Sequence, residues 1–165
     1  MEHLLILKKV MEKEADIYNE LLSLSQQQKK AVIKNNIPSV SAVAETQRQL
    51  LASLEGLEKE RASALRGYCA EQGLPEGSRL WEVIGGIRGT QREALQHLAE
   101  ELRQTAAKLR QADALNRMLI ETQLQYTSFC TNLLAGGENS LNTYSGSGHK
   151  NETNTVHPCL VDQVI

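Results

Sequence analysis

Histidine is the side chain most often used for metal binding and proton transfer near neutral pH, and the chain contains four of them. They stand at His3, His97, His149 and His157. No two are four residues apart, the spacing that places both rings on one face of a helix, and His157 with Cys159 is too short a stretch to form a site. The sequence therefore predicts no metal site, and solvated or hydrogen-bonded histidines instead.

The sequence also contains no pattern typical of a catalytic nucleophile or a phosphate-binding loop. The three cysteines, Cys69, Cys130 and Cys159, are odd in number and far apart, which argues against a disulfide framework. The glycine-rich residues 85–89 lack the lysine and hydroxyl of a phosphate-binding loop. Neighbouring carboxylates such as Glu100 and Glu101 fit the solvated face of a helix. We therefore expect no catalytic residue, no cofactor and no enzyme activity.

Composition narrows the class of protein further. Aromatic residues make up only 4% of the 165 residues, as in helical bundles and coiled coils. A net charge of −2 and a pI near 6.1 leave no electrostatic footprint for nucleic acid. No apolar run approaches the ~18 residues needed to cross a bilayer, and the first apolar run is too short for a signal peptide. We expect a cytoplasmic protein with no direct membrane insertion.

The longest predicted element is a helix over residues 90–135, which contain neither proline nor glycine. One series through it advances in alternating steps of three and four residues, the repeat of a helix that lies along partner helices. Its members are Leu95, Leu98, Leu102, Thr105, Leu109, Ala112, Asn116, Leu119, Gln123, Tyr126, Cys130 and Leu133. The rest of the chain must cover this stripe.

The second half of this helix is unusual because residues 122–137 include no charged side chain. A surface helix normally keeps a charged face, so we expect something to cover more than one side of this one. The candidate partner-binding residues are Leu115, Leu119, Ile120, Leu124, Tyr126, Phe129 and Leu133. For Leu119, Tyr126 and Leu133 the pattern favours the core of the bundle. Ile120 and Leu124 point the opposite way, which fits contact with other helices of the chain, a homodimer seam or a surface for a partner helix.

Two further long helices are predicted, over residues 2–35 and 39–72, with a break at Asn35-Asn36-Ile37-Pro38. In the first, Glu14, Ser25 and Gln28 interrupt the apolar repeat. The second carries the stripe Val40, Val43, Gln47, Leu50, Leu54, Leu57, Arg61, Leu65 and Tyr68. After Gly73, Ser78 can cap a short helix, and whether this is separate from the long helix is left open. The fold class is thus all-α: an elongated antiparallel bundle of three long helices and one short helix, twisted left-handed.

The predicted domain boundary follows residue 135. Residues 1–135 form the bundle, and residues 136–165 are a flexible C-terminal tail, because the stretch to 155 is mostly Gly, Ser, Asn and Thr. Apolar residues reappear at its end, namely Val156, Leu160, Val161, Val164 and Ile165. They fit a segment that orders on binding as well as they fit an ordinary terminus.

The order of these pieces resembles the FlgN family of flagellar type III export chaperones over essentially the whole chain. The matching segments are Tyr18-Asn19-Glu20-Leu21-Leu22, Glu45-Thr46-Gln47-Arg48-Gln49-Leu50-Leu51, Leu57-Glu58-Lys59-Glu60-Arg61, Asn116-Arg117-Met118-Leu119-Ile120, Leu124-Gln125-Tyr126 and Leu141-Asn142-Thr143-Tyr144-Ser145-Gly146-Ser147-Gly148. None is specific alone; the resemblance depends on their order and spacing.

The resemblance implies a cytoplasmic chaperone that binds hook-associated proteins, prevents their early assembly and delivers them to the export apparatus. It places the client site at residues 115–134 and the contact with the export gate at Tyr144, with the export ATPase as a further candidate partner. The chaperone is expected as a monomer or weak homodimer. The alternative is a structural coiled-coil scaffold without a client, held as a homodimer through Ile120 and Leu124.

Overall fold

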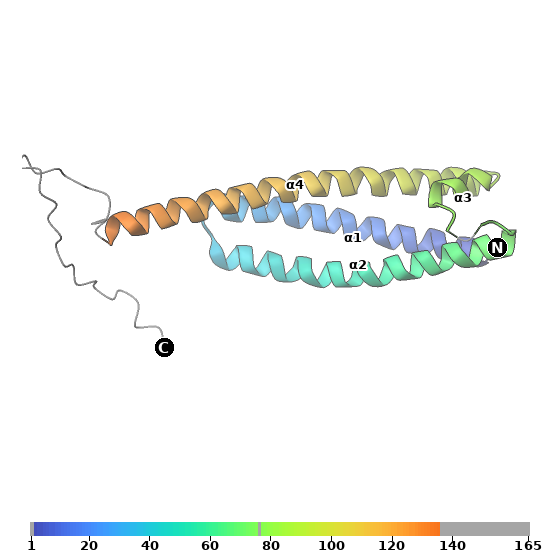
Figure 1. The fold of residues 1–165 in the computed structure, drawn as a ribbon, viewed down its shortest axis with the longest axis horizontal. Helices are drawn as coiled ribbons and strands as arrows, with labels where there is room; N and C mark the ends of the chain where they lie inside the picture. Colours follow the sequence, from blue (N-terminus) through green and yellow to red (C-terminus); the bar gives the residue numbers. More distant parts are fainter. Residues whose placement is uncertain (1, 76, 136–165) are drawn as a thin grey trace, which may run out of the picture. The chain divides into compact units, whose positions relative to one another are not determined.

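The computed structural model describes residues 2–75 and 77–135, which form four α-helices and no strand. These are α1 (Glu2–Ile33), α2 (Ile37–Gln72), α3 (Leu80–Gly86) and α4 (Thr90–Leu134), seen in Figure 1. The all-α prediction and the order of helices are confirmed. The chain divides into two units, Met1–Tyr126 and Thr127–Ile165, and the packing below concerns the first. The predicted tail, residues 136–165, lies outside the described residues, so the boundary at 135 stays a prediction.

Asparagine chemistry produces the turn between α1 and α2. Asn35 takes a left-handed φ of 51°, which asparagine tolerates better than most residues. The Asn36 backbone N–H donates to the carbonyl of Ala31 at 2.9 Å, while its side-chain oxygen accepts from the Ser39 N–H at 3.1 Å. One asparagine thus closes α1 and caps α2. Because that cap precedes Ile37, α2 begins two residues before the predicted start at Ser39.

A second break isolates α3 from both of its neighbours. Gly73 ends α2 with a φ of 65°, the conformation that glycine adopts at least cost. Ser78 does not cap the short helix as expected, because its hydroxyl donates to the Pro75 carbonyl at 2.8 Å. The Glu82 carboxylate instead accepts from the Arg79 N–H at 2.8 Å. The question left open by the sequence is settled: α3 is a separate helix that ends at Gly86, before α4 begins at Thr90.

The main apolar cluster lies where the N-terminal parts of α1 and α4 meet the C-terminal part of α2. It comprises Leu4, Leu7, Met11, Ala64, Ile84, Ile87, Leu95 and Ala99. Ile84 and Ile87 come from α3 and the residue that follows it, so the short helix covers this end of the cluster. Removing these side chains from water supplies most of the stabilisation of this part of the bundle.

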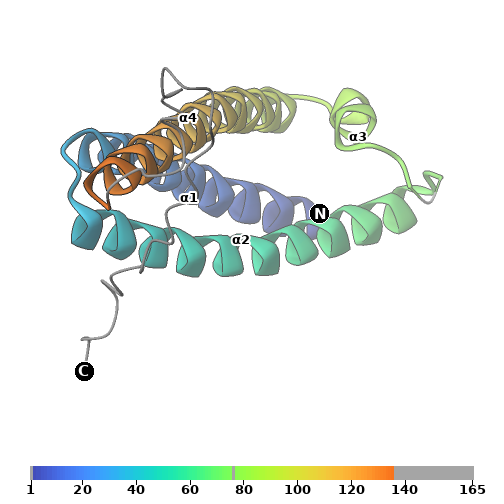
Figure 2. The same ribbon diagram turned by 60° about the vertical axis from the view of Figure 1, so that its left-hand side comes forward.

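The three long helices lie side by side within the first unit, as the two views in Figures 1 and 2 show. α1 and α2 run antiparallel and share the most extensive backbone contact of any two helices among the described residues. Close approach is helped at Gly67, where a Cβ atom would lie 2.6–2.8 Å from the ring of His3. α4 reaches the pair mainly through its side chains.

α1 and α4 run in the same direction, with paired residues about 91 positions apart. Leu4 and Leu95 share the apolar cluster, and Ser25 contacts Asn116, 91 residues later. By this offset Ile33, the last residue of α1, is level with Leu124. The predicted left-handed twist stays a prediction.

Candidate partner-binding site

The predicted client residues on α4 divide into half-buried and exposed sets. Leu115, Leu119 and Ile120 are half-buried. Leu124 and Tyr126, which close the first unit, are each 65% exposed. In the second unit Phe129 and Leu133 are each 61% exposed. Four of the seven residues therefore present large apolar side chains to solvent.

Tyr126 and Leu133 are a correction to the heptad pattern, which favoured the core for both. Upstream members of the same series are buried, including Leu95, Thr105 and Asn116. The repeat predicts which side chains lie on one face of α4. It does not predict how much of that face a neighbouring helix covers. In the first unit α1 ends at Ile33, level with Leu124 and before the level of Tyr126, so the helix that covers the upstream part of the stripe does not extend this far.

Two threonine hydroxyl groups of the charge-free segment are bonded within α4 itself. Thr122 donates to the carbonyl of Met118 at 2.8 Å, and Thr131 donates to that of Thr127 at 2.9 Å. A hydroxyl bonded to its own helix needs no partner from another chain. These two hydroxyl groups consequently add little desolvation cost when the segment makes contact.

A buried polar layer joins α1 to α4 beside these residues. Asn116 is only 3% exposed, and its side-chain nitrogen donates to the Ser25 carbonyl at 2.8 Å, the Ser25 hydroxyl at 3.0 Å and the Gln28 side-chain oxygen at 3.1 Å. The Ser25 hydroxyl in turn donates to the Asp113 carboxylate at 2.8 Å. The Asn116 side-chain oxygen, Oδ1, has no partner among the described residues. Leaving such an acceptor buried and unpaired costs about 1–3 kcal/mol.

An open groove lies against this layer and measures about 520 Å³. Residues of α1, α2 and α4 line it: Leu21, Gln28, Gln47, Leu51, Leu109, Asp113, Asn116, Arg117, Ile120 and Glu121. Ile120 is the one predicted client residue that faces it. The groove thus places α1 and α2 side chains next to a surface that the sequence assigned to α4 alone.

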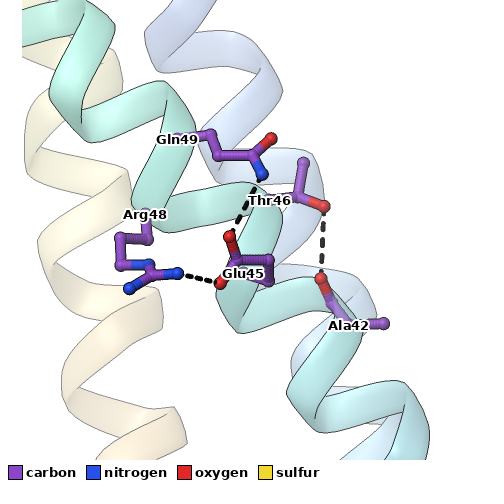
Figure 3. Close-up of polar contacts among 5 residues, drawn as sticks. All are labelled: Ala42, Glu45, Thr46, Arg48 and Gln49. Atoms are coloured by element: carbon purple, nitrogen blue, oxygen red, sulfur yellow. Dashed lines mark hydrogen bonds and ion pairs between the residues drawn. The ribbon is translucent and has the colours of Figure 1, made fainter.

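Polar side chains that flank Gln47, the polar residue that α2 contributes to the groove, are bonded within α2. Figure 3 shows Glu45 bonded to both Arg48 and Gln49, the latter at 3.1 Å, and the Thr46 hydroxyl donating to the Ala42 carbonyl at 3.2 Å. These bonds leave the carboxylate of Glu45 neutralised locally. None of these side chains donates to Asn116 Oδ1.

A second buried polar layer lies closer to the apolar cluster and is fully paired. Glu14 is 2% exposed, and its carboxylate accepts from the Arg61 side chain at 2.9 Å. Burial raises the pKa of Glu14 above its usual 4.5, while the hydrogen bond and charge of Arg61 oppose that shift. A cavity of about 220 Å³ beside the pair is lined by residues that include Tyr18 and Trp81. A paired carboxylate of this kind is occupied in holding α1 to α2.

Sequence reasoning missed Leu21, Leu51 and Asn116 as parts of a site. The available signal was a polar residue at a core position in each long helix, namely Gln28, Gln47 and Asn116. Residues 2–75 and 77–135 contain no group of three or more potential metal ligands. None of their helices is both long enough and apolar enough for a membrane span. Tyr144, the expected gate contact, lies outside the described residues.

The bundle and the exposed apolar end of α4 define a class: a helical protein with a candidate surface for another polypeptide. The chain belongs to the FlgN family, whose model, described as FlgN protein, matches residues 1–152. That family is one of flagellar export chaperones and not of enzymes. The chain is also similar to the uncharacterized protein YvyG of Bacillus subtilis (strain 168), with 24% identity over 131 residues, 79% of either chain. No solved structure matches the chain significantly.

Proposed function

We propose that this protein is a cytoplasmic export chaperone that binds hook-associated proteins, prevents their premature assembly and delivers them to the flagellar type III export apparatus. The observation that carries the proposal is the exposure of Leu124, Tyr126, Phe129 and Leu133 in a segment without charge. Membership of the FlgN family supports it independently.

The physical argument concerns what a chaperone must offer its client. Proteins that assemble through amphipathic helices expose apolar faces until a neighbour covers them. A second helix with exposed leucine and aromatic side chains can cover such a face for a time. Because the chaperone surface is already solvent-exposed, it gains apolar contact on binding without first unfolding.

The test is a binding titration of the purified full chain with purified hook-associated proteins. Leu124→Asp should weaken binding by at least tenfold, because it places a charge within the apolar contact. Leu5→Asp is the matched control, since Leu5 is 70% exposed on α1 and lies outside the proposed surface. Failure of the wild-type protein to bind any hook-associated protein would refute the proposal.

We assign delivery to the export gate to Tyr144, because the family resemblance implies a docking contact at this residue. Tyr144→Ala should leave client affinity unchanged and lower export of the client from cells. Equal loss of affinity and export would show instead that Tyr144 belongs to the client site. The export ATPase remains a further candidate partner, to be tested by the same binding measurement.

A homodimeric scaffold is the second candidate, favoured by the exposure of Leu124, which could equally contact a second copy. Sedimentation equilibrium separates the two functions. A dimer that persists when hook-associated protein is added would support the scaffold. A monomer or weak dimer that gives way to a chaperone–client complex would support the chaperone.

A further inference from the structure

Asn116 is oriented by its neighbours in a way that leaves one acceptor unused. The backbone carbonyl of Ser25 can only accept a hydrogen bond, so the side-chain nitrogen of Asn116 must face it. Oδ1 therefore points elsewhere, and no described residue donates to it. Asn116 is also one of the residues that line the groove. Oδ1 itself is buried, so a donor from outside the chain reaches it only when the side chains that line the groove move aside.

The groove offers both apolar walls and unpaired charge. Leu21, Leu51, Leu109 and Ile120 supply the apolar walls. Its volume of about 520 Å³ is within the range of roughly 300–1,000 Å³ typical of ligand sites. These dimensions suit a few large side chains of another helix better than they suit an extended protein surface.

The charged side chains of α4 at the groove predict that the group donating to Asn116 carries a positive charge. Asp113 and Glu121 contribute two carboxylates, and Arg117 contributes one guanidinium. Within the described residues Glu121 has no ion-pair partner, in contrast to Glu45, which α2 neutralises. An unused acceptor beside an excess of negative charge is complementary to a cationic N–H donor.

We propose that the groove receives an amphipathic helix of the client whose lysine or arginine side chain donates to Asn116 Oδ1 and pairs with Glu121. The apolar residues of the same helix contact Leu21, Leu51, Leu109 and Ile120. This proposal rests on the proposed function and extends it, since it adds α1 and α2 to the client surface. The surface would also prefer helices that carry a hydrogen-bond donor, because a helix without one would leave Asn116 unpaired.

The experiment measures the affinity of purified hook-associated protein for groove variants of the full chain. Leu51→Lys should weaken binding at least tenfold, because it replaces an apolar wall of the groove with a cation that repels the client's lysine or arginine. Leu51 is 52% exposed, so the lysine amine can reach solvent and the bundle can still fold. Leu5→Lys is the matched control and should change affinity less than twofold.

Charge reversal tests the polar part separately. Glu121→Lys should weaken binding about tenfold, whereas Glu60→Lys, an exposed α2 residue that lines neither cavity, should not. Changing the partnering client lysine or arginine to glutamate should restore affinity for Glu121→Lys alone. Circular dichroism of each variant checks that the bundle is intact.

The outcomes separate the two proposals. If wild-type chain binds no hook-associated protein, the proposed function fails and this inference fails with it. If wild-type chain binds and Leu124→Asp abolishes binding, but the groove variants match their controls, the function stands and the inference is overturned. In that case the client does not donate to Asn116.

Discussion

The two ends of the first unit are held together by different chemistry. At the N-terminal end of α1, apolar side chains from every helix meet in one cluster, with Leu7, Met11 and Ile84 fully buried. Toward the C-terminal end of α1, the contact between α1 and α4 depends on Ser25, Gln28 and Asn116 and opens into a groove. Apolar burial needs no particular partner orientation, whereas each hydrogen bond does.

This difference indicates that one end of the bundle contributes mainly to folding stability and the other mainly to binding. At the apolar end the large side chains are already buried, so a client can add little apolar contact there. The polar end contains an unpaired acceptor, half-buried Ile120 and exposed Leu124, each of which gains from contact with another chain. Variants at the two ends should consequently separate folding from binding.

The largest expected effect is at the apolar end. Leu95 is 1% exposed, so Leu95→Ala should lower the free energy of unfolding by about 3 kcal/mol through lost burial and the cavity left behind. Leu124→Ala, the matched change at an exposed leucine, should lower it by less than about 0.5 kcal/mol. Urea denaturation followed by circular dichroism measures both. Equal losses would show that α4 is covered at Leu124 as well.

The next effect concerns the paired layer between the two ends. Arg61→Ala leaves the Glu14 carboxylate buried without its partner and should cost about 2 kcal/mol at pH 7, less than for a fully enclosed pair because Arg61 is 31% exposed. Arg66→Ala, an exposed α2 residue outside both cavities, is the control.

This layer also predicts a dependence of stability on pH. Burial raises the folded-state pKa of Glu14 above 4.5, so the folded protein keeps this proton to a higher pH than the unfolded chain does. Stability from this group is therefore greatest below pH 4.5 and falls as the pH rises through the folded-state pKa. Arg61→Ala should extend the fall to higher pH, and Glu14→Gln should abolish it. Urea midpoints between about pH 4 and 8 give the measurement. A Glu14→Gln profile identical to wild type would contradict the assignment.

A smaller effect is expected at the unpaired layer. Asn116→Leu removes the unpaired acceptor and adds apolar contact, but it also removes the donor to Ser25 and Gln28, so the free energy of unfolding should change by less than about 1 kcal/mol. The same variant should bind client less tightly. Asn116→Asp, which has a similar shape but lacks the donating nitrogen, should destabilise the bundle. Thermal unfolding compares the three proteins, and a large loss of stability in Asn116→Leu would show that the layer is required for folding.

The smallest expected effects are those of glycine-to-alanine changes in and directly after α2, away from both layers. Gly56 lies within α2, and a Cβ atom there would meet nothing within 4 Å. Gly56→Ala should stabilise the protein by about 0.5–1 kcal/mol, because alanine loses less backbone freedom in a helix. Gly73→Ala should instead destabilise it, since Gly73 has a φ of 65°. The two melting temperatures, measured against wild type, decide between these signs.

Helical periodicity was sufficient to predict the fold. Alternating steps of three and four residues placed the α2 stripe from Val40 to Tyr68 correctly, and none of its members is exposed. The same periodicity failed at Tyr126, because a repeat within one helix carries no information about where its neighbour ends. That information lies in the offset between α1 and α4.

The groove was harder to predict because its components come from three helices. Glu14, Ser25 and Gln28 appeared as interruptions of the α1 repeat, although Glu14 and Ser25 are buried and bonded to other helices. A polar side chain at a core position is stabilised only when it has a hydrogen-bond partner, and the sequence alone does not identify that partner. The partners, Arg61, Asp113 and Asn116, stand 47 to 91 residues away in the chain. The role of Tyr144 and the client residues stays a prediction from family resemblance.

The short turn at residues 34–36 bears on the order in which the bundle forms during synthesis. α1 and α2 can pack together as soon as Gln72 has left the ribosome, because residues of α1 are closer in sequence to α2 than to α4. α4 joins a hairpin that already exists, with Leu95 reaching the apolar cluster before Asn116 reaches Ser25. A nascent chain thus exposes the α1–α2 side of the groove before its own last helix arrives to complete it.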